Sequence, residues 1–264
     1  MKEKGRINPL SAFATSILFV AIGVGFLLIG GFDLPKYTNE SNKNDVFTPI
    51  ENTDNANTNQ SLQLKKIEFS KKTKDCLRTT AINFVVDRSA TMTMKQDGGA
   101  KAKIEYLKDG LHGFLKQMDD ESLIGLQSFG GNEGTLDFTI GKLKGRRDEI
   151  TNKINSLKGG GSTPMHSGLS IAKSELSQAK NSYSGYSFTL ILLSDGMWNT
   201  GGDPTPIVNE IKTMGVRIFT IAYGSREVEE FMKQTASSTG DAYYSPGDDQ
   251  IIGILNQIAN KICN

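Results

Sequence analysis

The amino-acid sequence predicts an α/β fold in which a doubly wound, mostly parallel sheet is flanked by helices on both faces. From residue 81 onward, segments with strand character alternate with segments of helical periodicity, as in a chain of βαβ units. The strand segments 81–86 (AINFVV) and 188–194 (FTLILLS) are almost wholly apolar, which is typical of strands covered by helices on both sides. Segment 135–140 (TLDFTI) alternates instead, and this favours a half-exposed strand.

The other elements follow from the same two periodicities. Segment 103–118 carries Ile104 and Leu107 at helical spacing, and the closing segment 248–262 carries Ile251 and Leu255 in the same way. We expect strands at 81–86, 122–129, 135–140, 188–194, 216–223 and 242–245, and helices at 103–118, 148–157, 164–176, 206–214, 227–236 and 248–262.

The region before the first strand is rich in lysine. We interpret the basic cluster between Leu64 and Arg78 as a solvated surface, with contact to an anionic partner as the alternative. Residues 62–69 (LQLKKIEF) are also compatible with a short edge strand.

The charge balance argues against one class of partner. The 264 residues include 30 Lys and Arg against 29 Asp and Glu, a formal net charge of +1. Nucleic-acid-binding domains carry a basic excess, so we expect no nucleic-acid binding.

The N-terminal region predicts membrane attachment. Lys2, Lys4 and Arg6 precede an apolar run over 10–32, and about 20 apolar residues span a bilayer as a helix. The basic flank predicts a cytoplasmic N-terminus over 1–9, a single-pass signal anchor over 10–32 and a C-terminal domain outside the cytoplasm. The alternative is a cleaved signal peptide and a secreted protein. Polar residues 33–63 are expected to form a flexible linker, followed by a domain over 64–264.

Oxygen-bearing side chains stand in three predicted loops. Asp87, Ser89 and Thr91 stand at and just after the end of the first strand, Thr163 stands in the glycine-rich segment GGGSTP, and Asp195 follows the strand 188–194. Doubly wound sheets bind ligands beyond the carboxyl ends of their strands. Carboxylates and hydroxyls without Cys or His suit Mg²⁺ or Mn²⁺. Taken singly, each segment is also compatible with a helix cap or a turn.

In this order, the five residues resemble the metal-ion-dependent adhesion site (MIDAS) of the von Willebrand factor A-type (VWA) domain, with its D-x-S-x-S, Thr and Asp-Gly pattern. The resemblance covers most of the chain and implies a Rossmann-like VWA fold. It also implies that the Ser89, Thr91 and Thr163 hydroxyls bind the ion directly. Asp87 and Asp195 would act largely through bound water, and an open position would accept an acidic group from a protein partner. Thr91 replaces the usual serine, which keeps the hydroxyl and adds a methyl group.

Three further residues flank the predicted ligands on their loops. Arg88 follows Asp87, and Met197 and Trp198 follow Asp195 closely. Because exposed Arg and Trp are typical anchors of protein interfaces, we expect these residues to form the rim that contacts the partner. For Trp198, packing against its own loop is an equal alternative.

The motifs favour a binding domain over an enzyme. The sequence has no G-x-S-x-G elbow, no G-x-x-x-x-G-K-[ST] phosphate loop and no H-E-x-x-H pair. We therefore expect a non-enzymatic domain that binds a protein ligand through its metal ion, in adhesion or surface assembly. The alternatives are a structural subunit of a pilus or other surface complex and, less favoured, a metal-assisted hydrolase.

The two cysteines bracket the predicted domain. Cys76 precedes the first strand and Cys263 ends the closing helix. In a domain outside the cytoplasm such a pair predicts a disulfide, with two free thiols as the alternative. In integrin-type relatives the closing helix slides to switch the metal site. A bond at Cys263 would tether that helix, so we expect a nearly fixed affinity.

Overall fold

The computed structural model describes residues 66–96, 99–247 and 250–264, which lie within one compact unit. The strands are β1 (Thr80–Asp87), β2 (Leu123–Gly130), β3 (Glu133–Lys142), β4 (Ser187–Ser194), β5 (Arg217–Tyr223) and β6 (Ala242–Ser245). The helices are α1 (Lys71–Leu77), α2 (Lys103–Gln117), α3 (Arg147–Ser156), α4 (Met165–Ser182), α5 (Thr205–Thr213), α6 (Glu229–Thr235) and α7 (Gln250–Ile262), with short 3₁₀ helices η1 (Ala90–Thr93) and η2 (Thr239–Asp241).

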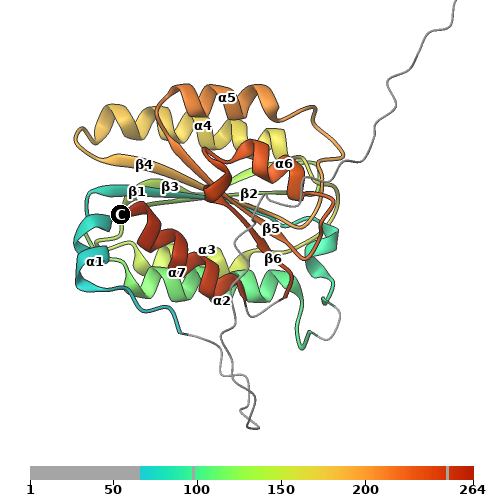
Figure 1. The fold of residues 1–264 in the computed structure, drawn as a ribbon, viewed down its shortest axis with the longest axis horizontal. Coiled ribbons are helices and arrows are strands. Elements are labelled where there is room, and N and C mark those ends of the chain that lie inside the picture. The colour runs from blue at the N-terminus through green and yellow to red at the C-terminus, as the bar shows by residue number, and fades with distance from the viewer. Residues whose placement is uncertain (1–65, 97–98, 248–249) are drawn as a thin grey trace, which may run out of the picture. The chain divides into compact units, whose positions relative to one another are not determined.

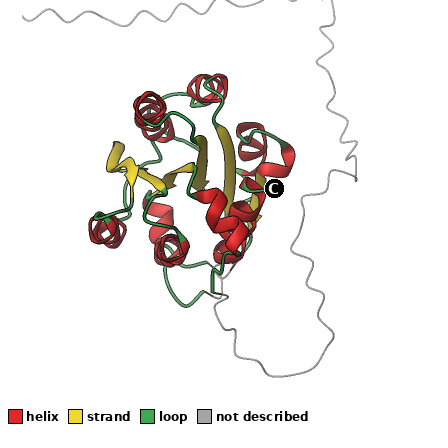
Figure 2. Cartoon of the chain, turned by 90° about the vertical axis from the view of Figure 1, so that its left-hand side faces the viewer, coloured by secondary structure: helices red, strands yellow, loops and turns green. Residues whose placement is uncertain are grey.

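These strands form one six-stranded sheet in the order β3-β2-β1-β4-β5-β6. Every neighbouring pair is parallel except β2 and β3, which run antiparallel at one edge. Helices α4 and α5 cover one face of the sheet, and α2, α3 and α7 cover the other (Figure 1). Figure 2 shows the sheet between these two layers. The predicted mostly parallel α/β sheet with helices on both faces is confirmed.

Alternation along the strands produces two hydrophobic cores. Ile82 and Phe84 of β1 point to the core under α2, α3 and α7, whereas Ala81 and Val85 point to the core under α4, α5 and α6. Successive side chains of a strand face opposite sides, so a strand buried on both faces has to be apolar at nearly every position. All eight residues of β1 are buried.

The winding of the chain places a ligand site beyond β1. After β1 the chain builds β2 and β3 on one side, and then crosses to build β4, β5 and β6 on the other. The carboxyl ends of β1 and β4 therefore flank the point where the strand order reverses, which is where doubly wound sheets bind ligands.

One helix was not predicted from the sequence. The lysine-rich segment forms α1, in which the Ser70 side chain accepts a hydrogen bond from the backbone N–H of Thr73, 3.1 Å away. Thr73 and Leu77 are buried, while Lys71, Lys72 and Lys74 face solvent. Residues 66–69 are not a strand, and 62–65 lie outside the described residues.

The predicted disulfide is present and connects α1 to the end of α7. Cys76 and Cys263 are bonded, with their Cα atoms 5.8 Å apart. The C-terminus lies beside α1 (Figure 1), where the Thr73 hydroxyl donates a hydrogen bond to Asn260 Oδ1 at 2.9 Å.

The predicted single-pass membrane localisation requires correction. In the part of the chain that the structure describes, no helix is long and apolar enough to cross a bilayer. The segment 10–32, on which that prediction rested, lies outside the described residues, as does the linker predicted over 33–63. The described structure therefore lends the single-pass prediction no support.

Candidate metal centre

The first loop of the site begins where β1 ends. Asp87 is fully buried, and its Oδ1 accepts a hydrogen bond from the backbone N–H of Ser89 at 2.7 Å. Ser89 is the N-cap residue of η1, and this turn brings the Ser89 and Thr91 hydroxyl oxygens within 3.0 Å of each other. The alternation of Asp, Ser and Thr thus gathers three oxygen groups at one strand end.

The third loop follows β4 and begins at Asp195. Two side-chain hydrogen bonds connect the end of β4 and this loop to the first loop. Thr91 Oγ1 donates to Asp195 Oδ1 at 2.7 Å, and Ser194 Oγ donates to Asp87 Oδ2 at 2.5 Å. Both contacts join segments about a hundred residues apart, because β1 and β4 are neighbours in the sheet. Asp87, Ser89, Thr91 and Asp195 therefore belong to one connected group.

The glycine-rich second loop lies against the first. The backbone N–H of Gly160 donates to the Arg88 carbonyl at 2.8 Å, and that of Ala90 donates to the Gly161 carbonyl at 3.0 Å. Gly161 adopts a positive φ of 70° and lies so close to Gly131 that a Cβ would be 2.4 Å from its Cα. Only glycine fits this turn, which leads directly into Thr163.

Thr163 is tied to the third loop by its backbone. Its N–H donates to Asn199 Oδ1 at 2.8 Å, and its carbonyl accepts from the Asn199 N–H at 3.4 Å. Thr163 as a residue is only 5% exposed. No hydrogen bond from its hydroxyl is found among the described residues, and this oxygen is not one of their fully buried, unpartnered side-chain atoms. The oxygen therefore keeps some accessible surface and is available to a ligand.

Burial sets the electrostatics of the two acids. Desolvation raises the pKa of Asp87 to about 6, and the neighbouring Asp195 charge adds to the rise, while the hydrogen bonds from Ser194 and Ser89 oppose it. The Asp195 side chain is wholly inaccessible, and its Oδ2 accepts a charge-assisted hydrogen bond from Lys103 Nζ at 2.7 Å.

The donor set fits a small, hard divalent cation. Among the described residues, no three His, Cys, Asp or Glu side chains cluster, so a cation here depends on the hydroxyls. Two adjacent ligands of an octahedral ion with metal–oxygen bonds of about 2.1 Å lie roughly 3.0 Å apart. The Ser89 and Thr91 oxygens have that separation.

The three predicted rim residues differ from one another in their surroundings. Met197 is 36% exposed. The ring of Trp198 packs on Phe231 of α6 at a centroid distance of 4.7 Å, beside the core under α4, α5 and α6, whereas the packing alternative placed it against its own loop. The Arg88 guanidinium donates to Ser128 Oγ and Thr135 Oγ1 on β2 and β3, so it is engaged within the domain.

Three residues of this centre were missed in the sequence. Ser194 precedes Asp195 directly, and its position at a strand end was the signal that could have found it. Asn199 and Lys103 gave no such signal, because their contacts with Thr163 and Asp195 span 36 and 92 residues. Only the folded sheet brings them to the site.

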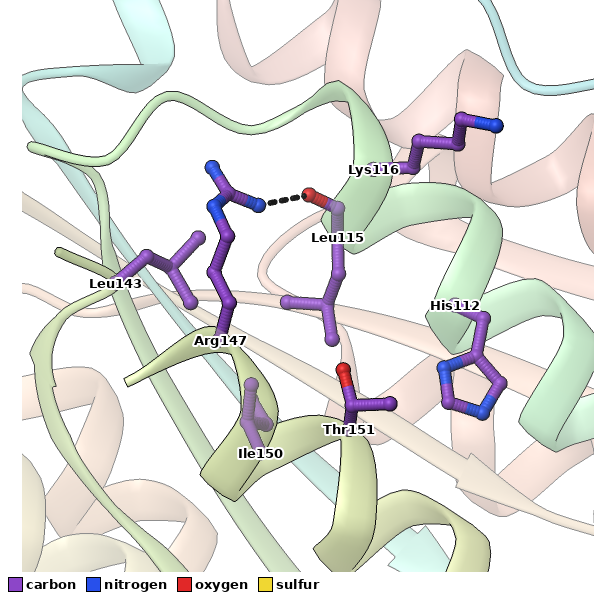
Figure 3. Close-up of a pocket in the computed structure, with 7 residues that line it drawn as sticks. All are labelled: His112, Leu115, Lys116, Leu143, Arg147, Ile150 and Thr151. Atoms are coloured by element: carbon purple, nitrogen blue, oxygen red, sulfur yellow. Dashed lines mark hydrogen bonds between the residues drawn. The ribbon is translucent and has the colours of Figure 1, made fainter. Parts of the chain in front are cut away.

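A separate hollow lies between α2 and α3 (Figure 3). It measures about 140 Å³ and is lined by His112, Leu115, Lys116, Leu143, Arg147, Ile150 and Thr151. Typical small-molecule pockets measure about 300–1,000 Å³. Arg147 is already bound to the Leu115 carbonyl at 3.0 Å, and His112 Nε2 lies 2.8 Å from Asn155 Oδ1. These contacts leave the three-loop centre as the better candidate site.

The fold and the three loops together define an α/β domain with a cluster of oxygen side chains where the strand order of its sheet reverses. The sequence over 81–257 matches the von Willebrand factor type A family, and the chain belongs to that family. The predicted family resemblance is confirmed.

Solved structures share the fold at low sequence identity. Proximal thread matrix protein 1 from the mussel byssus, in a structure with a zinc-occupied MIDAS motif, aligns with a TM-score of 0.60 and 18% identity over 70% of this chain and 48% of that one. The pilus adhesin SpaC from Lactobacillus rhamnosus GG aligns at 0.57 and 16% identity over 70% and 30%. The SpRpn10 VWA domain aligns at 0.54 and 18% identity over 68% and 95%.

The aligned part of this chain thus spans about half the length of the mussel protein. No curated protein is significantly similar in sequence.

Proposed function

We propose that this VWA domain binds a protein ligand through a divalent cation, Mg²⁺ or Mn²⁺, held by Asp87, Ser89, Thr91, Thr163 and Asp195. The observation that carries the proposal is that the three loops are hydrogen-bonded to one another. The Thr91 hydroxyl donates to Asp195, the Ala90 N–H donates to the Gly161 carbonyl, and the Thr163 N–H donates to Asn199.

Each residue has a distinct part in this proposal. The Ser89, Thr91 and Thr163 hydroxyls are the direct ligands, because a hydroxyl that donates its proton still has lone pairs to offer. Asp87 and Asp195 supply negative charge, and Asp195 accepts the hydrogen bond of the Thr91 hydroxyl and so orients it. When bound, the cation supplies a positive centre that an acidic side chain of the partner can complete.

The partner is an acidic group on a protein surface. Met197 is the predicted rim residue that is most available to it, since its side chain is exposed beside Asp195 on the third loop. An exposed methionine offers an adaptable apolar contact, while the cation contributes the charged one.

The biological setting that we propose is adhesion or the assembly of a larger protein structure. A pilus adhesin and a byssal matrix protein are among the proteins of similar fold. The adhesin supports a role in adhesion, and the matrix protein supports a role in the assembly of a larger structure. A metal-assisted hydrolase has less support. Both carboxylates accept hydrogen bonds within the domain, Asp87 from Ser194 and Asp195 from Thr91 and Lys103, which suits a structural part in the site better than proton transfer.

Calorimetric titration of the full chain with Mg²⁺ and Mn²⁺ tests the proposal. We expect one ion per chain. Thr163→Ala should weaken binding by about tenfold or more, whereas Thr163→Ser, which keeps the hydroxyl, should bind nearly as the parent does. Bound metal should also raise the thermal midpoint. Equal metal affinity in the alanine and serine variants would contradict the assigned ligand set.

A further inference from the structure

Lys103 is the one cation bonded to the carboxylates of the metal centre among the described residues. Its Nζ lies 2.7 Å from Asp195 Oδ2, and its side chain is only 13% exposed. The other oxygen of Asp195, Oδ1, accepts a hydrogen bond from the Thr91 hydroxyl at 2.7 Å. Both oxygens of this carboxylate are therefore occupied by donors from the first loop and from the start of α2.

The position of Lys103 is not explained by the stability of its helix. Lys103 is the first residue of α2, and a positive charge at a helix N-terminus opposes the helix dipole. The Ala102 side chain offers no cap. Instead, the Lys103 backbone N–H donates to the Met94 carbonyl at 3.0 Å, which fixes the start of the helix to the loop that follows η1. The Asp195 carboxylate is the feature that favours an ammonium at this place.

The two donors to Asp195 differ in their compatibility with a metal ion. The Thr91 hydroxyl donates a hydrogen bond to Asp195 and keeps its oxygen lone pairs, so it can remain in place beside a cation. The Lys103 ammonium has only protons to donate and carries a full charge. A divalent ion sharing Asp195 with this ammonium would meet repulsion in a buried setting, where charges interact more strongly than in water.

We propose that Lys103 is the resident cation of the metal-free site, and that a divalent ion binds only in competition with its ammonium. This inference rests on the metal site of the proposed function. Lys103 thereby lowers metal affinity, and it keeps the buried Asp195 paired while the metal is absent.

Lys103→Met tests the competition, with Lys108→Met as the matched control. Lys108 lies on the same helix, its side chain is 14% exposed, and it pairs with Glu105 at 2.9 Å. Both variants thus remove one positive charge from a similarly covered lysine. The Glu105 side chain paired with Lys108 is 48% exposed, whereas the Asp195 side chain paired with Lys103 is buried at the metal centre. The full chain is titrated with Mg²⁺ by calorimetry, and its unfolding by urea is measured in EDTA.

We expect Lys103→Met to bind Mg²⁺ about tenfold or more tightly than the parent, and to unfold at lower urea in EDTA because Asp195 loses its charged partner. Lys108→Met should bind Mg²⁺ as the parent does. Lys103→Gln, which keeps a donor without the charge, should also tighten binding and serves if the methionine variant does not fold. Equal or weaker binding by both Lys103 variants overturns the inference.

The outcomes separate this inference from the proposed function. If the parent binds Mg²⁺ and the Lys103 variants bind no better, the inference fails and the proposed function stands. If only the Lys103 variants bind, the inference holds and a metal-dependent function of the parent is contradicted. Absence of binding in every variant overturns both.

Discussion

The Ser194 hydroxyl donates a hydrogen bond to the fully buried Asp87 carboxylate, and their oxygens are 2.5 Å apart. The two residues stand at the carboxyl ends of β4 and β1, one position beyond the paired Val86 and Leu193. A buried carboxylate needs donors to offset its lost hydration. Ser194 supplies one, and this bond holds the pKa of Asp87 below the value that burial alone would produce.

Ser194→Ala should destabilise the metal-free protein by about 1–3 kcal/mol, the usual result of leaving a buried acceptor without its donor. The control is Ser187→Ala at the exposed start of the same strand, which should change the free energy of unfolding by less than about 1 kcal/mol. Urea unfolding at pH 7 in EDTA measures both. Equal changes in the free energy of unfolding for the two substitutions would show that the contact of Ser194 with Asp87 stabilises the protein no more than the Ser187 hydroxyl does.

Much of the fold could be predicted because its strands are buried on both faces. β1 and β4 must be apolar at almost every position, and the sequence shows this directly. The short helix α1 was missed because its signal is weak: only Thr73 and Leu77 are buried, and the lysines around them resemble a solvated surface. Its stability comes from packing on α7, which lies nearly two hundred residues away.

The candidate site was predictable where the chemistry is local. Asp87, Ser89 and Thr91 lie within one turn, and the structure joins them to Asp195. The engagement of Arg88 with Ser128 and Thr135 could not be foreseen, since it depends on how β2 and β3 are arranged. The same holds for Lys103, whose partner is known only once α2 is placed over the sheet.

Gly161→Ala should disturb the metal centre as well as the fold. An added Cβ would meet the Gly131 backbone at 2.4 Å, and φ is 70°. Gly145→Ala is the control, because φ is 73° there and nothing lies within 4 Å of the added carbon. We expect Gly145→Ala to cost about 1–2 kcal/mol through backbone strain. Gly161→Ala should lower the free energy of unfolding by more than Gly145→Ala does. It should also weaken Mg²⁺ binding, since the loop leads into Thr163. Unchanged Mg²⁺ affinity in Gly161→Ala would contradict this prediction, because it would show that a displaced glycine-rich loop still holds the metal site in place.

Asp241 should stabilise the fold in a pH-dependent way. Burial raises its pKa, but hydrogen bonds from Arg217 and Ser238 and the Arg217 charge outweigh this, so the pKa lies below the usual 3.8. A lowered carboxyl pKa gives stability that is present above the unfolded value and lost as pH falls through the folded value. Asp241→Asn should therefore lower the free energy of unfolding by about 1–3 kcal/mol at pH 7. The difference in free energy of unfolding between parent and variant should become smaller below about pH 4.

Urea unfolding of the parent and Asp241→Asn across this pH range measures that difference. Asp75→Asn is the control, because Asp75 sits in an exposed ion pair with Lys71, and such pairs contribute less than about 1 kcal/mol. A difference for Asp241→Asn that stays constant down to pH 2 would contradict the lowered pKa.

The disulfide should be a large contributor to stability. It closes a loop with a sequence separation of 187, for which the chain-entropy model gives about 5 kcal/mol. The Cys76→Ser/Cys263→Ser variant should lose stability on this scale in urea unfolding. Dithiothreitol should lower the free energy of unfolding of the parent to that of the variant, and it should not change the free energy of unfolding of the variant. Two free sulfhydryls in the unfolded, unreduced parent would contradict the bond.

The same bond should have little effect on metal affinity. α7 is held to α1 by the disulfide and by the Thr73–Asn260 hydrogen bond. It also packs closely on α2, where a Cβ at Gly110 would lie 3.0 Å from Leu255. Because these contacts remain when the disulfide is removed, we expect α7 to keep its place. The folded double-serine variant should then bind Mg²⁺ within about threefold of the oxidised parent, under 1 kcal/mol. Calorimetric titration below the melting point of the variant measures this. A gain of many-fold in affinity would reveal a switch that the disulfide holds off, and would contradict a domain of fixed affinity.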